Sequence, residues 1–128
     1  MKRILIMEDE PALAVVMQRA LAAENYHVEI SENGKEGLEL IRVFKPDLLI
    51  LDIIMPEMDG VEVLSYLHRN NMHIPTLAIS GGGNMVTMKD CLNISQVMGA
   101  VDCLQKPFSQ NDLILKVSAL LEATPDRS

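Results

Sequence analysis

DLLILDIIMPEMDG, residues 47–60, joins a short apolar run to a carboxylate and then to a loop-forming segment. Residues 48–51 are continuously apolar, a pattern that predicts a strand buried on both faces. Asp52 follows directly, while Pro56 and the Asp59-Gly60 pair predict a loop and then the start of a helix. A buried strand that ends in an acid beside a loop is typical of the ligand-binding edge of an open α/β sheet.

Apolar runs and amphipathic segments alternate along the rest of the chain. Because alternating strands and helices form a parallel sheet covered on both faces, the pattern predicts a single α/β domain. The predicted strands are residues 4–7, 26–30, 48–51, 74–79 and 101–104. The predicted helices begin near Pro11, Asn33, Asp59, Met85 and Ser109, the fourth covering residues 85–98.

The expected fold is a doubly wound (βα)5 domain of the flavodoxin-like type. It covers residues 1–123 and leaves residues 124–128 as a frayed tail. Right-handed crossovers leave few strand orders, and the adopted order is the common one for this fold, 2-1-3-4-5.

Helical spacing of apolar residues predicts the inner face of each helix. Two helix caps are also expected, one from Asn33 and one from Ser109 with Asp112. The predicted inner residues are Leu13, Val16, Met17, Ala20 and Leu21; Leu38, Ile41 and Phe44; Val61, Leu64 and Leu67; and Leu113, Val117 and Leu120.

Composition narrows the class of protein. The formal net charge of −7 disfavours binding of nucleic acid or an acidic membrane by this domain alone. The apolar segments are too short for a transmembrane helix, so a cytoplasmic domain is expected. Cys91 and Cys103 have no metal-binding spacing, which predicts reduced thiols.

Polar side chains follow four of the predicted strands. In the adopted order, Glu8 and Asp9 after the first strand lie beside Asp52 after the third. Ser80 and Lys106 follow the fourth and fifth strands and flank the same crevice. Crowded carboxylates either take up protons or hold a cation, and hard oxygen ligands suit Mg²⁺. Asp52 could then attack a phosphoryl group, with Lys106 and Ser80 binding its oxygens.

These motifs together resemble the receiver domain of response regulators in two-component signalling, over residues 2–122. The resemblance implies that Asp52 is the phospho-acceptor, Ser80 the switch hydroxyl and Lys106 the phosphate-pairing lysine. It implies Mg²⁺ held by Glu8, Asp9, Asp52 and the main-chain carbonyl of Ile54. It also implies a cis Lys106-Pro107 bond.

The resemblance further implies a phosphoryl donor, either a histidine kinase or a histidine phosphotransfer protein, and a downstream protein target that the sequence does not name. Phosphorylation would switch partner binding through the face formed by the fourth helix, fifth strand and fifth helix. The chain would be a monomer or weak dimer. It would catalyse only its own phosphorylation and dephosphorylation and would not be a turnover enzyme.

One departure from the family pattern keeps an alternative open. Receivers usually carry Tyr or Phe three residues before the lysine, where this chain has Cys103. The alternative is a degenerate receiver that acts as a phosphorylation-independent interaction module. A flavodoxin-type FMN carrier is disfavoured because Glu8, Asp9 and Glu10 stand where a phosphate would bind. An aspartyl phosphatase is disfavoured because Asp52 lacks the second Asp of a D-x-D motif.

Overall fold

A computed structural model describes residues 1–53, 60–81 and 101–123. Its sheet has five parallel strands in the order β2-β1-β3-β4-β5, which confirms the expected doubly wound fold. The elements are β1 (Arg3–Met7), α1 (Pro11–Ala22), β2 (His27–Ser31), α2 (Gly34–Phe44), β3 (Leu48–Asp52), α3 (Gly60–Arg69), β4 (Thr76–Ser80), β5 (Val101–Gln105) and α5 (Gln110–Ala123). The helix predicted over residues 85–98 lies outside the described residues.

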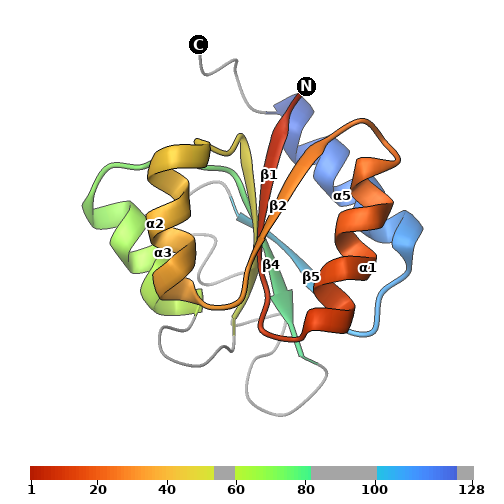
Figure 1. Cartoon of the computed structure of the whole chain (residues 1–128), viewed down its shortest axis with the longest axis horizontal. Coiled ribbons are helices and arrows are strands. Elements are labelled where there is room, and N and C mark those ends of the chain that lie inside the picture. The colour runs from red at the N-terminus through yellow and green to blue at the C-terminus, as the bar shows by residue number, and fades with distance from the viewer. Residues whose placement is uncertain (54–59, 82–100, 124–128) are drawn as a thin grey trace.

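Helices cover both faces of the sheet, with α1 and α5 on one side and α2 and α3 on the other (Figure 1). Alternate residues of each central strand enter opposite cores, as the two-residue period of a strand requires. Ile4 and Ile6 pack in the core beneath α1 and α5, whereas Leu5 and Met7 pack beneath α2 and α3. All five residues of β3 are buried, as expected for a strand covered on both faces.

Local signals set several helix ends as predicted. The Asn33 side chain accepts a hydrogen bond of 2.9 Å from the Glu36 backbone N–H at the start of α2. Ser109 Oγ accepts one of 3.0 Å from the Asp112 N–H at the start of α5. Pro11 occupies the first turn of α1, where its missing N–H costs little.

Two predictions of inner-face residues are wrong. Val16 is 57% exposed, and Ala14 is buried in its place on α1. Val61 is 41% exposed, whereas Val63 is fully buried on α3. Both helices carry apolar residues on more than one face, so spacing alone left the rotation of each helix ambiguous. Among the residues that the structure describes, no helix is both long and apolar enough to cross a membrane.

The two valines of α3 give a matched test of this packing. Val63→Ala should lower the free energy of unfolding by roughly 2 kcal/mol, because it removes buried methyl groups and leaves a cavity. Val61→Ala should change it by less than about 0.5 kcal/mol, because the side chain is partly exposed. Urea denaturation of both variants would measure the difference, and equal losses would contradict the burial of Val63 and the exposure of Val61.

Candidate functional site

Strand register brings the predicted site residues to one edge of the sheet. Met7 pairs with Leu51, so the residues that follow them, Glu8 and Asp52, leave β1 and β3 at the same level. Asp52 pairs with Ile79, which places Ser80 one residue further along β4. Ser80 in turn pairs with Gln105, the residue before Lys106.

Three acids form a cluster at this edge. Glu8, Asp9 and Asp52 each offer one carboxylate oxygen, and these oxygens lie within 4.8 Å of one another. Glu8 and Asp52 are buried, whereas Asp9 is exposed. The backbone holds Glu8 in place, because its N–H donates to the Ser31 carbonyl at 3.0 Å and its Oε2 accepts from the Glu10 N–H at 3.2 Å.

Lys106 joins the two buried acids. Its Nζ lies 3.2 Å from Asp52 Oδ2, to which it donates a hydrogen bond, and 3.3 Å from Glu8 Oε1. The backbone N–H of Lys106 donates to the Ser80 carbonyl at 2.8 Å, so β4 helps to fix the start of the lysine side chain. The bond from Lys106 to Pro107 is cis, as predicted.

The crowding of the acids shifts the protonation of Glu8. Burial is the largest cause, and the Asp52 carboxylate adds to it through a hydrogen bond and its charge, so the pKa of Glu8 rises to about 8. The Glu10 N–H and the Lys106 charge oppose this rise. Burial lowers the pKa of Lys106, but the charges and hydrogen bonds of Asp52 and Glu8 outweigh it, so that pKa is raised.

Ser80 lies at the same edge of the sheet, where its hydroxyl is a further polar group. Its Oγ is buried and has no hydrogen-bond partner among the described residues. A buried hydroxyl without a partner costs free energy unless a ligand satisfies it. Ile54, whose carbonyl was expected to be a metal ligand, lies outside the described residues.

Gly60 positions α3 against the end of β3. The sequence predicted only that a helix begins near this residue. Its N–H donates to the Ile53 carbonyl at 2.8 Å, so the first turn of α3 lies against the end of β3. A Cβ at Gly60 would lie 2.7 Å from both the Asp52 carbonyl oxygen and Ile53 Cα, closer than real contacts allow. Only glycine therefore fits this approach without a shift.

Cys103 differs from the expectation of a reduced thiol. It is disulfide-bonded in this structure and is buried on β5 beside Ile53 and Ala78. Spacing along the chain could not predict this, because a disulfide depends on the distance between two side chains in space. The other cysteine in the sequence, Cys91, lies outside the described residues.

Comparison with known proteins identifies the family. The sequence model of the Response regulator receiver domain family matches residues 4–118. The chain belongs to this family. Response regulator MprA of Mycolicibacterium vanbaalenii is 34% identical to this receiver domain over 125 residues, covering 97% of the chain and 52% of that protein. Transcriptional regulatory protein TrcR of Mycobacterium tuberculosis is 33% identical over 119 residues, covering 93% of the chain and 45% of the relative.

Solved structures agree with this assignment. The signal receiver domain of a LuxO repressor protein from Vibrio parahaemolyticus superposes with a TM-score of 0.86 at 29% identity, covering 95% of this chain and 91% of that one. The Francisella response regulator 1452 receiver domain gives 0.86 at 25% identity, covering 98% and 100%. This receiver domain spans about half the length of the curated relatives that it matches.

The pKa of Glu8 predicts how stability depends on pH when no divalent cation is present. Between pH 4.5 and about 8 the folded protein keeps a proton on Glu8 that the unfolded chain has lost. The free energy of unfolding should therefore fall as pH rises through this window. Glu8→Gln should flatten the dependence and make the protein more stable than wild type at pH 8.5. Thermal denaturation of both proteins in EDTA at several pH values would measure this pH dependence. Parallel curves for wild type and Glu8→Gln would contradict the raised pKa of Glu8.

Gly60 and Gly81 form a matched pair for testing the close approach at Asp52. Gly60→Ala should lower the free energy of unfolding by roughly 1–3 kcal/mol, because the first turn of α3 must shift. Gly81→Ala should have little effect, because no described residue lies within 4 Å of a Cβ built there. Chemical denaturation would compare the two variants, and equal stabilities would show that α3 accommodates the methyl group.

Proposed function

We propose that this receiver domain accepts a phosphoryl group on Asp52 from a phosphohistidine of a histidine kinase or a histidine phosphotransfer protein. A carboxylate oxygen of Asp52 forms a bond to phosphorus while the phosphorus–nitrogen bond of the donor breaks. The imidazole of the donor leaves with the electron pair of that bond and takes up a proton.

The convergence of the Asp52 carboxylate, a second buried acid and the Lys106 ammonium carries this proposal. Asp52 lies at the carboxyl end of β3. Lys106 Nζ is 3.2 Å from its carboxylate and can pair with an incoming phosphoryl oxygen. The Ser80 hydroxyl is buried at the next strand end and, among described residues, is not hydrogen-bonded. It can donate to another phosphoryl oxygen.

Receiver domains generally bind Mg²⁺ at an acidic cluster, and the residues here fit that ion. The donors are carboxylate oxygens, which hard cations prefer, and three of them come within 4.8 Å of one another. Glu8, Asp9 and Asp52 would hold Mg²⁺, together with the Ile54 carbonyl. Bound there, Mg²⁺ would neutralise charge on the transferring phosphoryl group.

Phosphorylation would act by changing which groups Lys106 and Ser80 pair with. Lys106 exchanges carboxylate contacts for phosphoryl oxygens, and Ser80 gains an acceptor. These changes bias β4, β5 and the surface around α5 and residues 85–98 between two states that bind different protein partners. The protein is thus a switch that catalyses only its own phosphorylation and dephosphorylation. By itself, the domain binds neither nucleic acid nor membrane, and it is a monomer or weak dimer.

Cys103 favours a second candidate, a receiver that binds partners without phosphorylation. The side chain is 2% exposed where the family usually has a large aromatic ring. In receivers with an aromatic residue here, the ring moves inward when the hydroxyl at the Ser80 position moves. A small side chain that is already buried cannot change its burial in this way. The intact acidic cluster and Lys106 favour the phosphorylated switch over this alternative.

Intact-protein mass spectrometry tests the assignment of Asp52. Wild type, incubated with acetyl phosphate and Mg²⁺, should gain one phosphoryl group, and the gain should disappear in EDTA. Asp52→Asn should abolish it, because an amide is not nucleophilic enough to attack phosphorus. Asp112→Asn, which changes an exposed acid on α5, is the matched control and should label like wild type.

The remaining outcomes separate the two candidates. Labelling that persists in Asp52→Asn would overturn the acceptor assignment. A folded wild type that neither labels nor binds Mg²⁺ would support the phosphorylation-independent interaction module. A wild type that binds Mg²⁺ but does not label from acetyl phosphate would then be tested with a phosphorylated histidine phosphotransfer protein as donor.

A further inference from the structure

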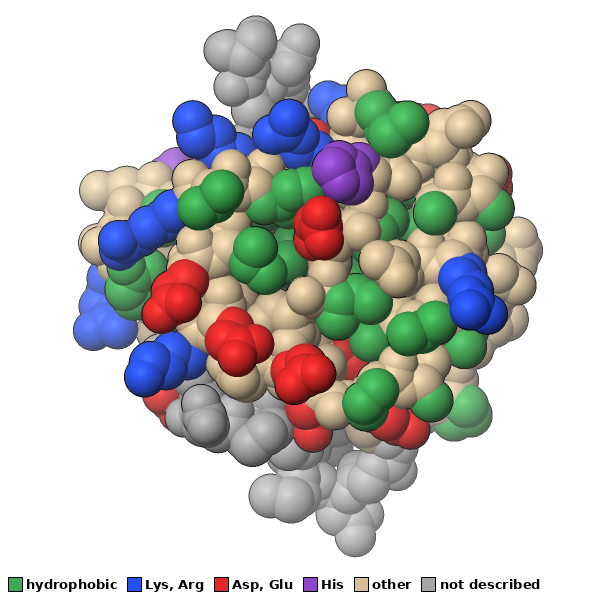
Figure 2. All heavy atoms as spheres, viewed as in Figure 1, with side chains coloured by type: hydrophobic (Ala, Val, Ile, Leu, Met, Phe, Trp, Pro, Cys, Tyr) green, Lys and Arg blue, Asp and Glu red, His purple; other side chains and the backbone are tan. Residues whose placement is uncertain are grey.

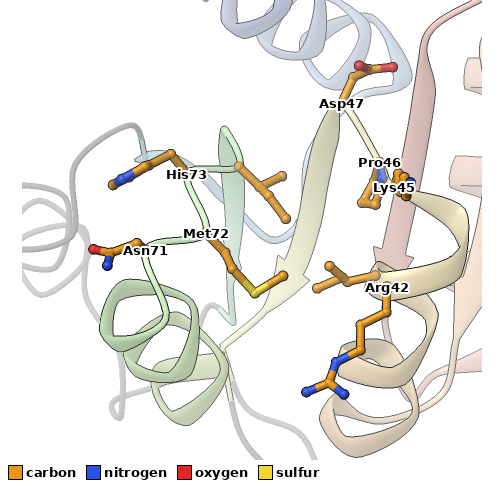
Figure 3. A pocket seen from close by; sticks show the side chains of 9 residues that line it. Arg42, Lys45, Pro46, Asp47, Asn71, Met72 and His73 are labelled. Atoms are coloured by element: carbon orange, nitrogen blue, oxygen red, sulfur yellow. The ribbon is translucent and has the colours of Figure 1, made fainter. Parts of the chain in front are cut away.

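A second concave site lies at the opposite end of the sheet from Asp52. It is a hollow of about 560 Å³ between the segment that connects α2 to β3 and the segment that connects α3 to β4 (Figure 3). Its lining residues are Ile41, Arg42, Lys45, Pro46, Asp47, Asn71, Met72, His73 and Ile74. The length of β3, about 13 Å at 3.3 Å per residue, separates this hollow from the acidic cluster.

Four of the residues that line the hollow are apolar. Ile41 and Ile74 are buried and belong to the core beneath α2 and α3, and Pro46 is also buried. The partly buried Met72 side chain points from the loop after α3 toward α2 (Figure 3). A Met side chain adapts its shape to irregular partners, so these apolar side chains suit contact with the apolar part of a ligand.

The charges at the rim are mainly positive, although the whole chain is acidic at −7. Arg42 and Lys45 are both exposed at the α2 side of the hollow. Asp47 is directed away from it and accepts a hydrogen bond of 2.8 Å from the Arg3 backbone N–H (Figure 3). On the face seen in Figure 2, most Lys and Arg side chains lie along the upper and left parts, and Asp and Glu side chains lie among them and toward the lower part.

Arg42 is held in place at the edge of the site. Its Nη2 donates a hydrogen bond of 2.8 Å to the Tyr66 hydroxyl on α3. Arg42 also lines a smaller hollow of about 280 Å³, together with Lys35, Leu38, Glu39 and Tyr66. A guanidinium positioned in this way can pair with a carboxylate through its remaining N–H groups.

We propose that the hollow binds a small molecule with an apolar body and one carboxylate. The body would lie against Ile41, Met72 and Ile74, and the carboxylate would pair with a basic side chain at the rim, Arg42 or Lys45. A volume of about 560 Å³ is within the range of small-molecule sites, roughly 300–1,000 Å³, whereas protein interfaces extend over larger, flatter surfaces. This site does not depend on phosphorylation of Asp52.

The test uses two probes of the same shape, 2-naphthoate and its neutral analogue 2-naphthamide. In ¹H–¹⁵N NMR titrations, naphthoate should shift the backbone signals of Lys45, Asn71 and Met72 in a saturable way. Naphthamide should bind more weakly at the same place. Added sodium chloride should weaken naphthoate binding more than naphthamide binding, because salt screens the ion pairs.

Matched variants isolate the role of the rim charges. The double variant Arg42→Gln, Lys45→Gln should bind naphthoate roughly fivefold more weakly, because the exposed basic groups that pair with the carboxylate are lost. Its affinity for naphthamide should be unchanged. Arg19→Gln removes the same kind of charge from the last turn of α1 and should bind naphthoate like wild type.

Several results would overturn the proposal. They are equal affinity for the two probes, unchanged naphthoate binding by the double variant, absence of saturable shifts, or shifts centred on Glu8 and Asp52. An acidic peptide that shifts the signals of the hollow when naphthoate does not would assign it to a protein partner instead. The unchanged fold of each variant would be checked by its thermal midpoint.

Discussion

The burial of two carboxylates at adjacent strand ends is the constraint around which this receiver domain is arranged. Glu8 and Asp52 lie side by side because β1 and β3 are neighbours in register. Two buried like charges repel each other, and burial increases the cost of each. Lys106 offsets part of that cost through contacts with both acids. Burial and the negative charge that Lys106 does not offset raise the pKa of Glu8, and that charge favours the binding of a cation at the cluster.

The hydrophobic core makes this arrangement possible. Each central strand is buried on both faces, so its end is held by packing from two helical layers. Gly60 allows α3 to approach the end of β3 closely enough for a backbone hydrogen bond to Ile53. The position of the Asp52 carboxylate therefore depends on residues that take no part in the acidic cluster.

The two ends of the strands have different electrostatic characters. At the carboxyl ends, Glu8 and Asp9 lie close to Asp52, and Lys106 forms an ion pair with Asp52. At the amino ends of β3 and β4, Arg42 and Lys45 border a hollow that is lined in part by apolar residues. Basic side chains are favoured there because α2 and α3 both end nearby and their C-terminal carbonyls carry partial negative charge. The two ends of the central strands therefore differ in charge and polarity.

The sequence by itself determined the fold class, the strand positions and the residues that end the strands. These features are local, since apolar runs, caps such as Asn33 and acids after a strand all act through near neighbours in the chain. Only the tertiary structure decided which faces of α1 and α3 are buried, as Val16 and Val61 show. It alone also decided the pairing of Lys106 with both acids, the bonded state of Cys103 and the existence of the hollow beside Arg42. Those features depend on distances between segments that are remote in sequence, which no local pattern encodes.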